Sequence, residues 1–172
     1  MKKIYLIMLV FIPALLTAQQ NVQLQDGYQQ FRYPNGNISS EGYIRNGKPD
    51  GYWKSYYVTG VLKSEGRRTS FLLDSLWVFY DQAGDTIEKI SYLLGKRNGY
   101  SLKYKKDPVY GNYLFSSELY AGDRKEGLAK IYFPDGKIKQ TIPYSDSKKD
   151  GLSREYDHDG KIIALLEYNN DF

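Results

Sequence analysis

The chain has 172 residues, no cysteine and a formal net charge of +4. The lack of cysteine excludes disulfide bonds, thiolate metal sites and lipidation of a cysteine. Lys and Arg alternate with Asp and Glu along the chain, which argues against a nucleic-acid-binding protein, because such proteins concentrate basic residues in one stripe.

The N-terminal segment has the parts of a secretory signal peptide. Two lysines follow Met1, residues 4–16 are mostly apolar, and Ala18 is a small residue suited to signal peptidase. The apolar run is shorter than the roughly 20 residues that cross a bilayer, which disfavours the alternative of a retained anchor. We therefore predict a signal peptide at residues 1–18, cleavage near Ala18, a periplasmic or secreted protein without a stable membrane span, and a linker at residues 19–26.

The remaining chain, residues 27–172, is built from a repeat. The sequence contains 18 tyrosines, 16 glycines and six prolines, a composition that favours strands over helices. Each unit opens with a glycine, or with a serine once, and the interval between openers is 24 residues except for one of 28. The residue after the opener is aromatic or leucine, and tyrosine stands five positions after it in most units. The openers are Gly27, Gly51, Ser75, Gly99, Gly127 and Gly151.

Each unit is predicted to be a β-hairpin. Pairs such as Asn35-Gly36 and Asp135-Gly136 favour tight turns between stretches of aromatic and β-branched residues. A helical repeat is the alternative, but two glycines in most units disfavour it. We predict an all-β fold, an elongated antiparallel meander of about six stacked β-hairpin repeats, in which each hairpin is stabilised by its neighbours.

The segment from Glu41 to Gly60 resembles the MORN repeat variant family. It contains a glycine, an Asn-Gly-Lys turn, an Asp-Gly pair, two aromatic residues, a tyrosine and a second glycine turn, and poorer copies follow at residues 94–104, 121–136 and 146–160. The resemblance implies an elongated β-repeat sheet with a role in protein or membrane contact. Related bacterial repeat proteins are often labelled antitoxin or immunity proteins. Ser75 in place of glycine and the longer fourth unit depart from the pattern.

No catalytic constellation is evident in the sequence. His158 is the single histidine, and it lies between Asp157 and Asp159 where a hairpin turn is predicted. A triad, a zinc site or an EF-hand built there lacks its remaining residues, so a solvated turn histidine is favoured. We predict no enzymatic activity, no cofactor and no metal. A hydrolase whose carboxylates come from distant strands is the alternative.

Strand alternation assigns side chains to two faces. Tyrosines and leucines one and five positions after the opener, such as Tyr28 and Tyr52, are predicted to form the core. Trp53, Trp77 and Phe79 then lie on the opposite face, where they form a candidate platform for a protein, a peptide or a glycan. The alternative is that a curled sheet or residues 19–26 cover these rings.

The longest hairpin loop, residues 105–112, is a second candidate site. Insertions in repeat proteins fall on loops that often carry specificity, and Val109 and Tyr110 are its apolar residues. A merely tolerated insertion is the alternative. Open edge strands at the ends of the array also allow self-association. We therefore expect an exported scaffold for an unidentified protein partner. The resemblance implies an antitoxin or immunity role for it, and carbohydrate or cell-envelope binding is the rival function.

Overall fold

The computed structural model describes residues 24–171, and the predicted signal peptide lies outside them. All regular structure in this range is β-strand. The strands are β1 (Gly27–Arg32), β2 (Ile38–Arg45), β3 (Lys48–Tyr56), β4 (Leu62–Thr69), β5 (Leu72–Tyr80), β6 (Thr86–Leu93), β7 (Lys96–Asp107), β8 (Gly111–Ala121), β9 (Arg124–Tyr132), β10 (Ile138–Ser145), β11 (Lys148–Tyr156) and β12 (Ile162–Asp171).

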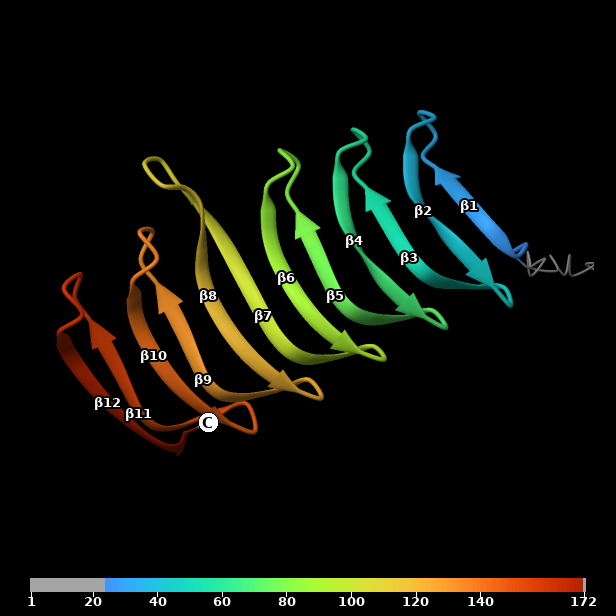
Figure 1. Ribbon diagram of the computed structural model, residues 1–172. Coiled ribbons are helices and arrows are strands. Elements are labelled where there is room, and N and C mark those ends of the chain that lie inside the picture. The colour runs from blue at the N-terminus through green and yellow to red at the C-terminus, as the bar shows by residue number, and fades with distance from the viewer. Residues whose placement is uncertain (1–23, 172) are drawn as a thin grey trace, which may run out of the picture.

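The strands form one antiparallel sheet in which each pairs with the next in chain order. Figure 1 shows this sheet as an open row of hairpins, with β1 at one end and β12 at the other. The predicted all-β antiparallel meander of six hairpins is therefore confirmed. Within residues 24–171, no helix is long and apolar enough to cross a membrane.

The opener of each unit after the first lies at a bulge in the sheet. The register shifts between Gly42 and Tyr43, so that two extra residues of β3, Gly51 and Tyr52, form a bulge opposite β2. Gly51 adopts a φ of 81°, and Ser75, the serine opener, adopts 59°. A left-handed residue at this bulge bends the strand, which explains the regular placement of glycine in the sequence.

Neighbouring units are joined by hydrogen bonds between their connecting turns. Phe71 N–H donates to the Pro49 carbonyl at 2.7 Å, and Ser70 N–H donates to Asp50 Oδ1 at 3.3 Å. The residue before the opener accepts in the same way in other units, where Asp26, Asp74, Asn98 and Glu126 bind the N–H groups of Gly47, Leu94, Gly122 and Asp146. The side chain of the residue before the opener thus accepts a hydrogen bond from the backbone of the next connecting turn.

Residues before β1 also contact the repeat array. Asp26 caps the first connecting turn, and Leu24 packs against the buried core. Both residues belong to the predicted linker, so its last residues are part of the repeat array.

The core lies on the face that carries the two tryptophans. The exposed fraction is 6% for Trp53 and 2% for Trp77, and these rings form a cluster with Ile44. Side chains that pack against the cluster are Leu24, Phe31, Leu73, Phe79 and Tyr92. We call this side of the sheet the tryptophan face. The prediction that the first-position tyrosines form the core is therefore wrong.

Two glycines explain why a single-layer sheet buries these rings. Gly66 is the cross-strand partner of both Trp53 and Trp77, and Gly42 pairs with Trp53 from the other side. A Cβ atom built on Gly66 would lie 2.5 Å from Cγ of Trp77, so the indole occupies the space of the missing side chain. The Trp77 indole N–H also donates to the Arg67 carbonyl at 2.7 Å, which satisfies its buried polar group.

The tryptophan face changes character toward the C-terminus. Small residues, Ser101, Ala129 and Ser153, occupy the buried positions that the tryptophans hold earlier. Tyrosines stacked with cations then follow: Arg97 lies 4.1 Å from the Tyr120 ring centre, Lys125 lies 4.5 Å from that of Tyr144, and Lys149 lies 4.7 Å from that of Tyr168. Cation–π contacts thus replace part of the apolar packing.

Replacing Gly66 by alanine tests the packing of tryptophan on glycine. The new methyl group clashes with the Trp77 ring, and we expect the variant to lose about 1–3 kcal/mol of unfolding free energy, the usual cost of overpacking. Urea unfolding followed by tryptophan fluorescence measures the loss. Because the backbone of Gly66 is not left-handed, the cost is steric, and it should shrink when Gly66→Ala is made together with Trp77→Leu. Equal costs in both backgrounds would contradict this packing.

Candidate functional site

Exposed apolar side chains also line the side of the sheet opposite the tryptophan face. These side chains form a row of tyrosines and leucines, and most of them directly follow a unit opener. We call this side of the sheet the tyrosine face. Their exposed fractions are 52% for Tyr28, 58% for Tyr43, 54% for Tyr52, 51% for Leu76, 58% for Tyr100 and 46% for Leu128. These residues come from every first strand between β1 and β9, so the row crosses most of the sheet.

The residues of the row pair with side chains of the neighbouring strands on the same face. Tyr28 and Tyr43 are cross-strand partners, and their rings meet edge to face with centres 5.4 Å apart. Farther along, Tyr100 pairs with Leu119, and Leu128 pairs with Pro143. Between these pairs, Tyr52 pairs with Arg67 and Leu76 pairs with Ser91, so the band contains polar as well as apolar side chains.

A parallel row of charged residues flanks this band. Glu41 pairs with Lys54, and Lys54 pairs with Glu65, on the same side of the sheet. The fifth-position tyrosines bind these carboxylates: Tyr56 OH donates to Glu41 at 2.5 Å, and Tyr80 OH donates to Glu65 at 2.7 Å. The tyrosine face is thus an apolar band with a charged margin.

The hydrogen bonds of this margin shift proton affinities. The hydroxyl of Tyr56 lowers the pKa of the Glu41 carboxyl. Burial, followed by the hydrogen bond to Glu65, raises the pKa of Tyr80 to about 12. Both phenols stay protonated at physiological pH and donate to Glu41 and Glu65, so these hydrogen bonds fix the orientation of the two rings.

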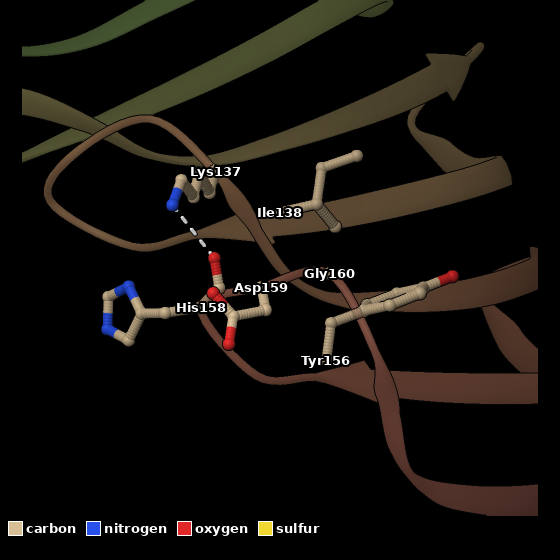
Figure 2. Close-up of a pocket in the computed structure, with 6 residues that line it drawn as sticks. All are labelled: Lys137, Ile138, Tyr156, His158, Asp159 and Gly160. Carbon is tan, nitrogen blue, oxygen red and sulfur yellow. Dashed lines mark hydrogen bonds between the residues drawn. The ribbon is translucent and has the colours of Figure 1, made fainter.

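A hollow at the last hairpin turn contains the single histidine of the chain. Its walls are Lys137, Ile138, Tyr156, His158, Asp159 and Gly160, drawn in Figure 2. The His158 ring stacks on Phe133 with centres 3.9 Å apart, its Nδ1 lies 3.5 Å from Asp135, and its carbonyl accepts a bond from Lys137 Nζ at 2.8 Å.

These contacts join two neighbouring turns, and the hollow belongs to the repeat. Units one and two enclose an equivalent hollow at the matching positions, lined by Arg32, Gly36, Asn37, Ile38, Tyr56 and Gly60. Over residues 24–171, no group of three or more His, Asp or Glu side chains is arranged to hold a metal ion. His158 therefore packs one turn on the next.

The tryptophan platform predicted from the sequence is not available at the surface. Trp53 and Trp77 are buried, and Phe79 is half-buried with its ring 6.2 Å from that of Trp77. The prediction of an open platform is wrong because these large rings fill the space above glycines and thereby build the core. Leu24, which belongs to the segment 19–26 of the alternative prediction, packs against the same cluster.

The predicted loop site is exposed. Val109 is 84% exposed and Tyr110 is 58% exposed, at the turn between β7 and β8. Asp107 Oδ1 accepts the N–H groups of both residues, at 2.8 and 3.0 Å, so the tip is held in a defined turn. Binding through these residues stays a prediction.

The tyrosine face was missed, although the sequence contains a signal for it. Alternate residues share a face of a strand, so Lys54 lies on the same side as Tyr52 and Tyr56. A charged residue between two tyrosines indicates that this side meets water. The glycines at positions 42 and 66 also indicate a place where a large ring packs closely.

Comparison with known proteins gives a family match in four segments. Residues 25–46, 49–67, 125–146 and 149–170 match the family model described as MORN repeat variant. The matched segments comprise units at both ends of the array, and the unmatched middle contains Ser75 and the long β7–β8 loop. No curated protein matches the chain.

The raised pKa of Tyr80 predicts alkaline destabilisation. An unfolded tyrosine deprotonates near 10, whereas folded Tyr80 keeps its proton to about 12. The unfolded state therefore binds fewer protons between these values, and the unfolding free energy falls as pH rises through them. Urea unfolding at pH 8 and at pH 11 should show a smaller loss in Tyr80→Phe than in the parent. Glu65→Gln, which removes the charge that the phenol meets, should also reduce the loss, and an unchanged loss in both variants would contradict this origin.

Proposed function

Because the chain belongs to the MORN repeat variant family, we propose that it is a non-enzymatic scaffold that binds a protein partner through its tyrosine face. The all-β MORN repeat fold is generally a non-catalytic, repeat-based interaction module. The observation that carries the proposal is the exposed band of tyrosine and leucine side chains, from Tyr28 to Leu128.

The chemistry of the band fits a protein surface. Tyrosine presents a large apolar ring and a hydroxyl with few rotatable bonds, and it is enriched at protein interfaces. With strands about 4.8 Å apart, a band over nine strands extends roughly 40 Å, which exceeds the size of a small ligand. The charges of Glu41, Lys54 and Glu65 at its margin supply a polar rim that selects among partners.

The loop tip offers a second contact. Val109 and Tyr110 project from the long turn between β7 and β8, and the Asp107 carboxylate fixes their backbone. An apolar tip that is already ordered loses little conformational entropy on binding. We include it in the proposal as a contact separate from the tyrosine face.

Export is part of the same proposal and rests on the N-terminal sequence. The scaffold would act in the periplasm or outside the cell after cleavage near Ala18, and an antitoxin or immunity role is its most concrete form. The intact mass of the protein from the periplasmic and secreted fractions tests export. A chain that begins at Gln19 supports it, and a full-length chain in the cytoplasm contradicts it.

Site-specific photocrosslinking tests the face. A benzoylphenylalanine at position 52 or 100, in place of Tyr52 or Tyr100, should crosslink the same protein from envelope or secreted fractions. Its matched control replaces Lys103, an exposed residue of β7 on the tryptophan face. The crosslink should weaken at least tenfold when Leu76→Ser is added.

The outcomes of this experiment separate the rival functions. Equal crosslinking from position 103 would contradict the choice of face. If neither tyrosine position captures a protein, the proposal that this face binds a protein is wrong. Binding of the same variants to glycans and envelope material then becomes the next measurement. A probe in place of Tyr110 reports on the loop tip independently.

A further inference from the structure

The charged row of the tyrosine face changes its character along the sheet. Near β1 it contains carboxylates on both sides of a cation, since Glu41 and Glu65 both pair with Lys54. Near β12 the order is reversed, and Thr141 pairs with a cation on each side. These cations are Lys130 on β9 and Arg154 on β11.

Thr141 stands at the repeat position of a glutamate. Arg154 and Tyr156 follow it at the intervals that separate Glu41 from its lysine and tyrosine partners. In the earlier unit, the tyrosine hydroxyl donates to Glu41 at 2.5 Å. Figure 2 shows the Tyr156 hydroxyl directed away from His158, so it takes no part in the stacking of the turns. The last unit thus keeps the cation and the phenol of this arrangement and lacks the carboxylate.

The hydroxyl of Thr141 is a buried polar group without a partner. Thr141 is 4% exposed, and its Oγ1 forms no hydrogen bond with any of the described residues. Most buried polar groups in proteins have a partner, because an unpaired one costs free energy. A carboxylate oxygen at this position accepts the hydroxyl proton, as the glutamates of the earlier units accept protons from their tyrosines.

The chain does not neutralise the two cations beside Thr141. Lys130 and Arg154 are half-buried, and no ion pair of the described side chains includes either one. Glu167, a carboxylate of β12 on this face, pairs with Leu152 instead. Because β9 and β11 are two strands apart, roughly 10 Å, a carboxylate above Thr141 lies between the cations and interacts with both.

An apolar hollow of about 300 Å³ adjoins Lys130 on the same face. Leucines and tyrosines from β7, β8 and β9 line it, among them Leu102, Leu114 and Leu128. This volume is at the lower limit of cavities that hold a small ligand. The hollow therefore fits an apolar side chain of a longer segment that also carries the carboxylate.

We propose that Thr141, Lys130 and Arg154 bind an aspartate or glutamate side chain of the protein partner. The partner's carboxylate takes the place that Glu41 fills in its own unit, and an apolar residue of the same segment enters the hollow. Hydrogen bonds from cationic donors to a carboxylate are stronger than neutral ones, so the site selects an acidic segment. This inference rests on the proposed function, because it names the chemistry that the tyrosine face recognises.

Binding of a model peptide tests the site directly. The probe is a short series of Glu-Ser-Leu repeats with an uncharged fluorescent dye, and its control has glutamine in place of glutamate. Fluorescence polarisation should show that the parent binds the glutamate peptide at least tenfold more tightly. Equal affinities for the two peptides would overturn the proposal.

Two variants with the same change of charge locate the binding. Arg154→Gln should weaken the affinity for the glutamate peptide at least fivefold. Lys54→Gln is the matched control in the same row, and it should change the affinity less than twofold because Glu41 and Glu65 already flank this cation. Both variants should keep the circular dichroism of the parent. Equal losses in the two variants would show a response to net charge alone and contradict the site.

Thr141→Glu supplies the carboxylate from the chain itself. This variant should lose the preference for the glutamate peptide, and its urea midpoint should lie above that of Thr141→Gln, which adds an uncharged side chain of the same size. If Thr141→Glu is no more stable than Thr141→Gln, the proposal is overturned, whether or not any peptide binds.

The remaining outcomes separate this inference from the proposed function. Inorganic sulfate that displaces the peptide better than glutarate, a dicarboxylate of the same charge, would overturn the choice of a carboxylate. A protein captured by the probe in place of Tyr100 with a yield that Arg154→Gln does not change contradicts this site and leaves the proposed function intact. A peptide preference that depends on Arg154, with no protein captured by either probe, supports the carboxylate site and contradicts the proposed protein partner.

Discussion

The structure depends on the packing of tryptophan against glycine across neighbouring strands. A single-layer sheet has no second layer to cover it, so its core must come from its own side chains. Gly42 and Gly66 leave space above the backbone, and Trp53 and Trp77 fill it. The bulge at each unit opener bends the strands, and Ile44 and Leu73 then complete the cluster. One face thus becomes a core although, within residues 24–171, no second sheet or helix packs on it.

Burial of the tryptophans determines the character of the opposite face. Once the apolar packing lies on one side, tyrosines at the first position of each unit, such as Tyr52 and Tyr100, remain in water. Tyrosine tolerates this position because its hydroxyl is hydrated while its ring covers neighbouring aliphatic groups. The carboxylates of Glu41 and Glu65 then orient the tyrosines of the next row. The core and the proposed binding surface therefore lie on different faces of the same strands.

The fold was predicted correctly from the sequence, but the orientation of its faces was not. The regular spacing of glycine indicates a bulge and two turns in each unit. Each of these needs a backbone conformation that glycine adopts easily, so the repeat is visible in the sequence. The face assignment failed because Tyr52 and Trp53 are neighbours and both are aromatic, so strand alternation alone does not say which points inward. The decisive information is the glycine on the adjacent strand. That glycine, Gly66, is 13 residues from Trp53 in the sequence, and its role requires the register of β3 against β4.

The unmatched middle of the chain shows which parts of the repeat are free to change. In the turn between β4 and β5, Ser70 and Phe71 adopt φ values of 48° and 80° where the first turn has Asn46 and Gly47. A left-handed non-glycine residue costs about 1–2 kcal/mol, yet the Phe71 N–H still binds the Pro49 carbonyl of the preceding unit. The inter-unit hydrogen bond is therefore kept while the turn sequence changes. Because Phe71 is also exposed beside Arg68, the turns are positions where this sheet can vary its surface without changing its register.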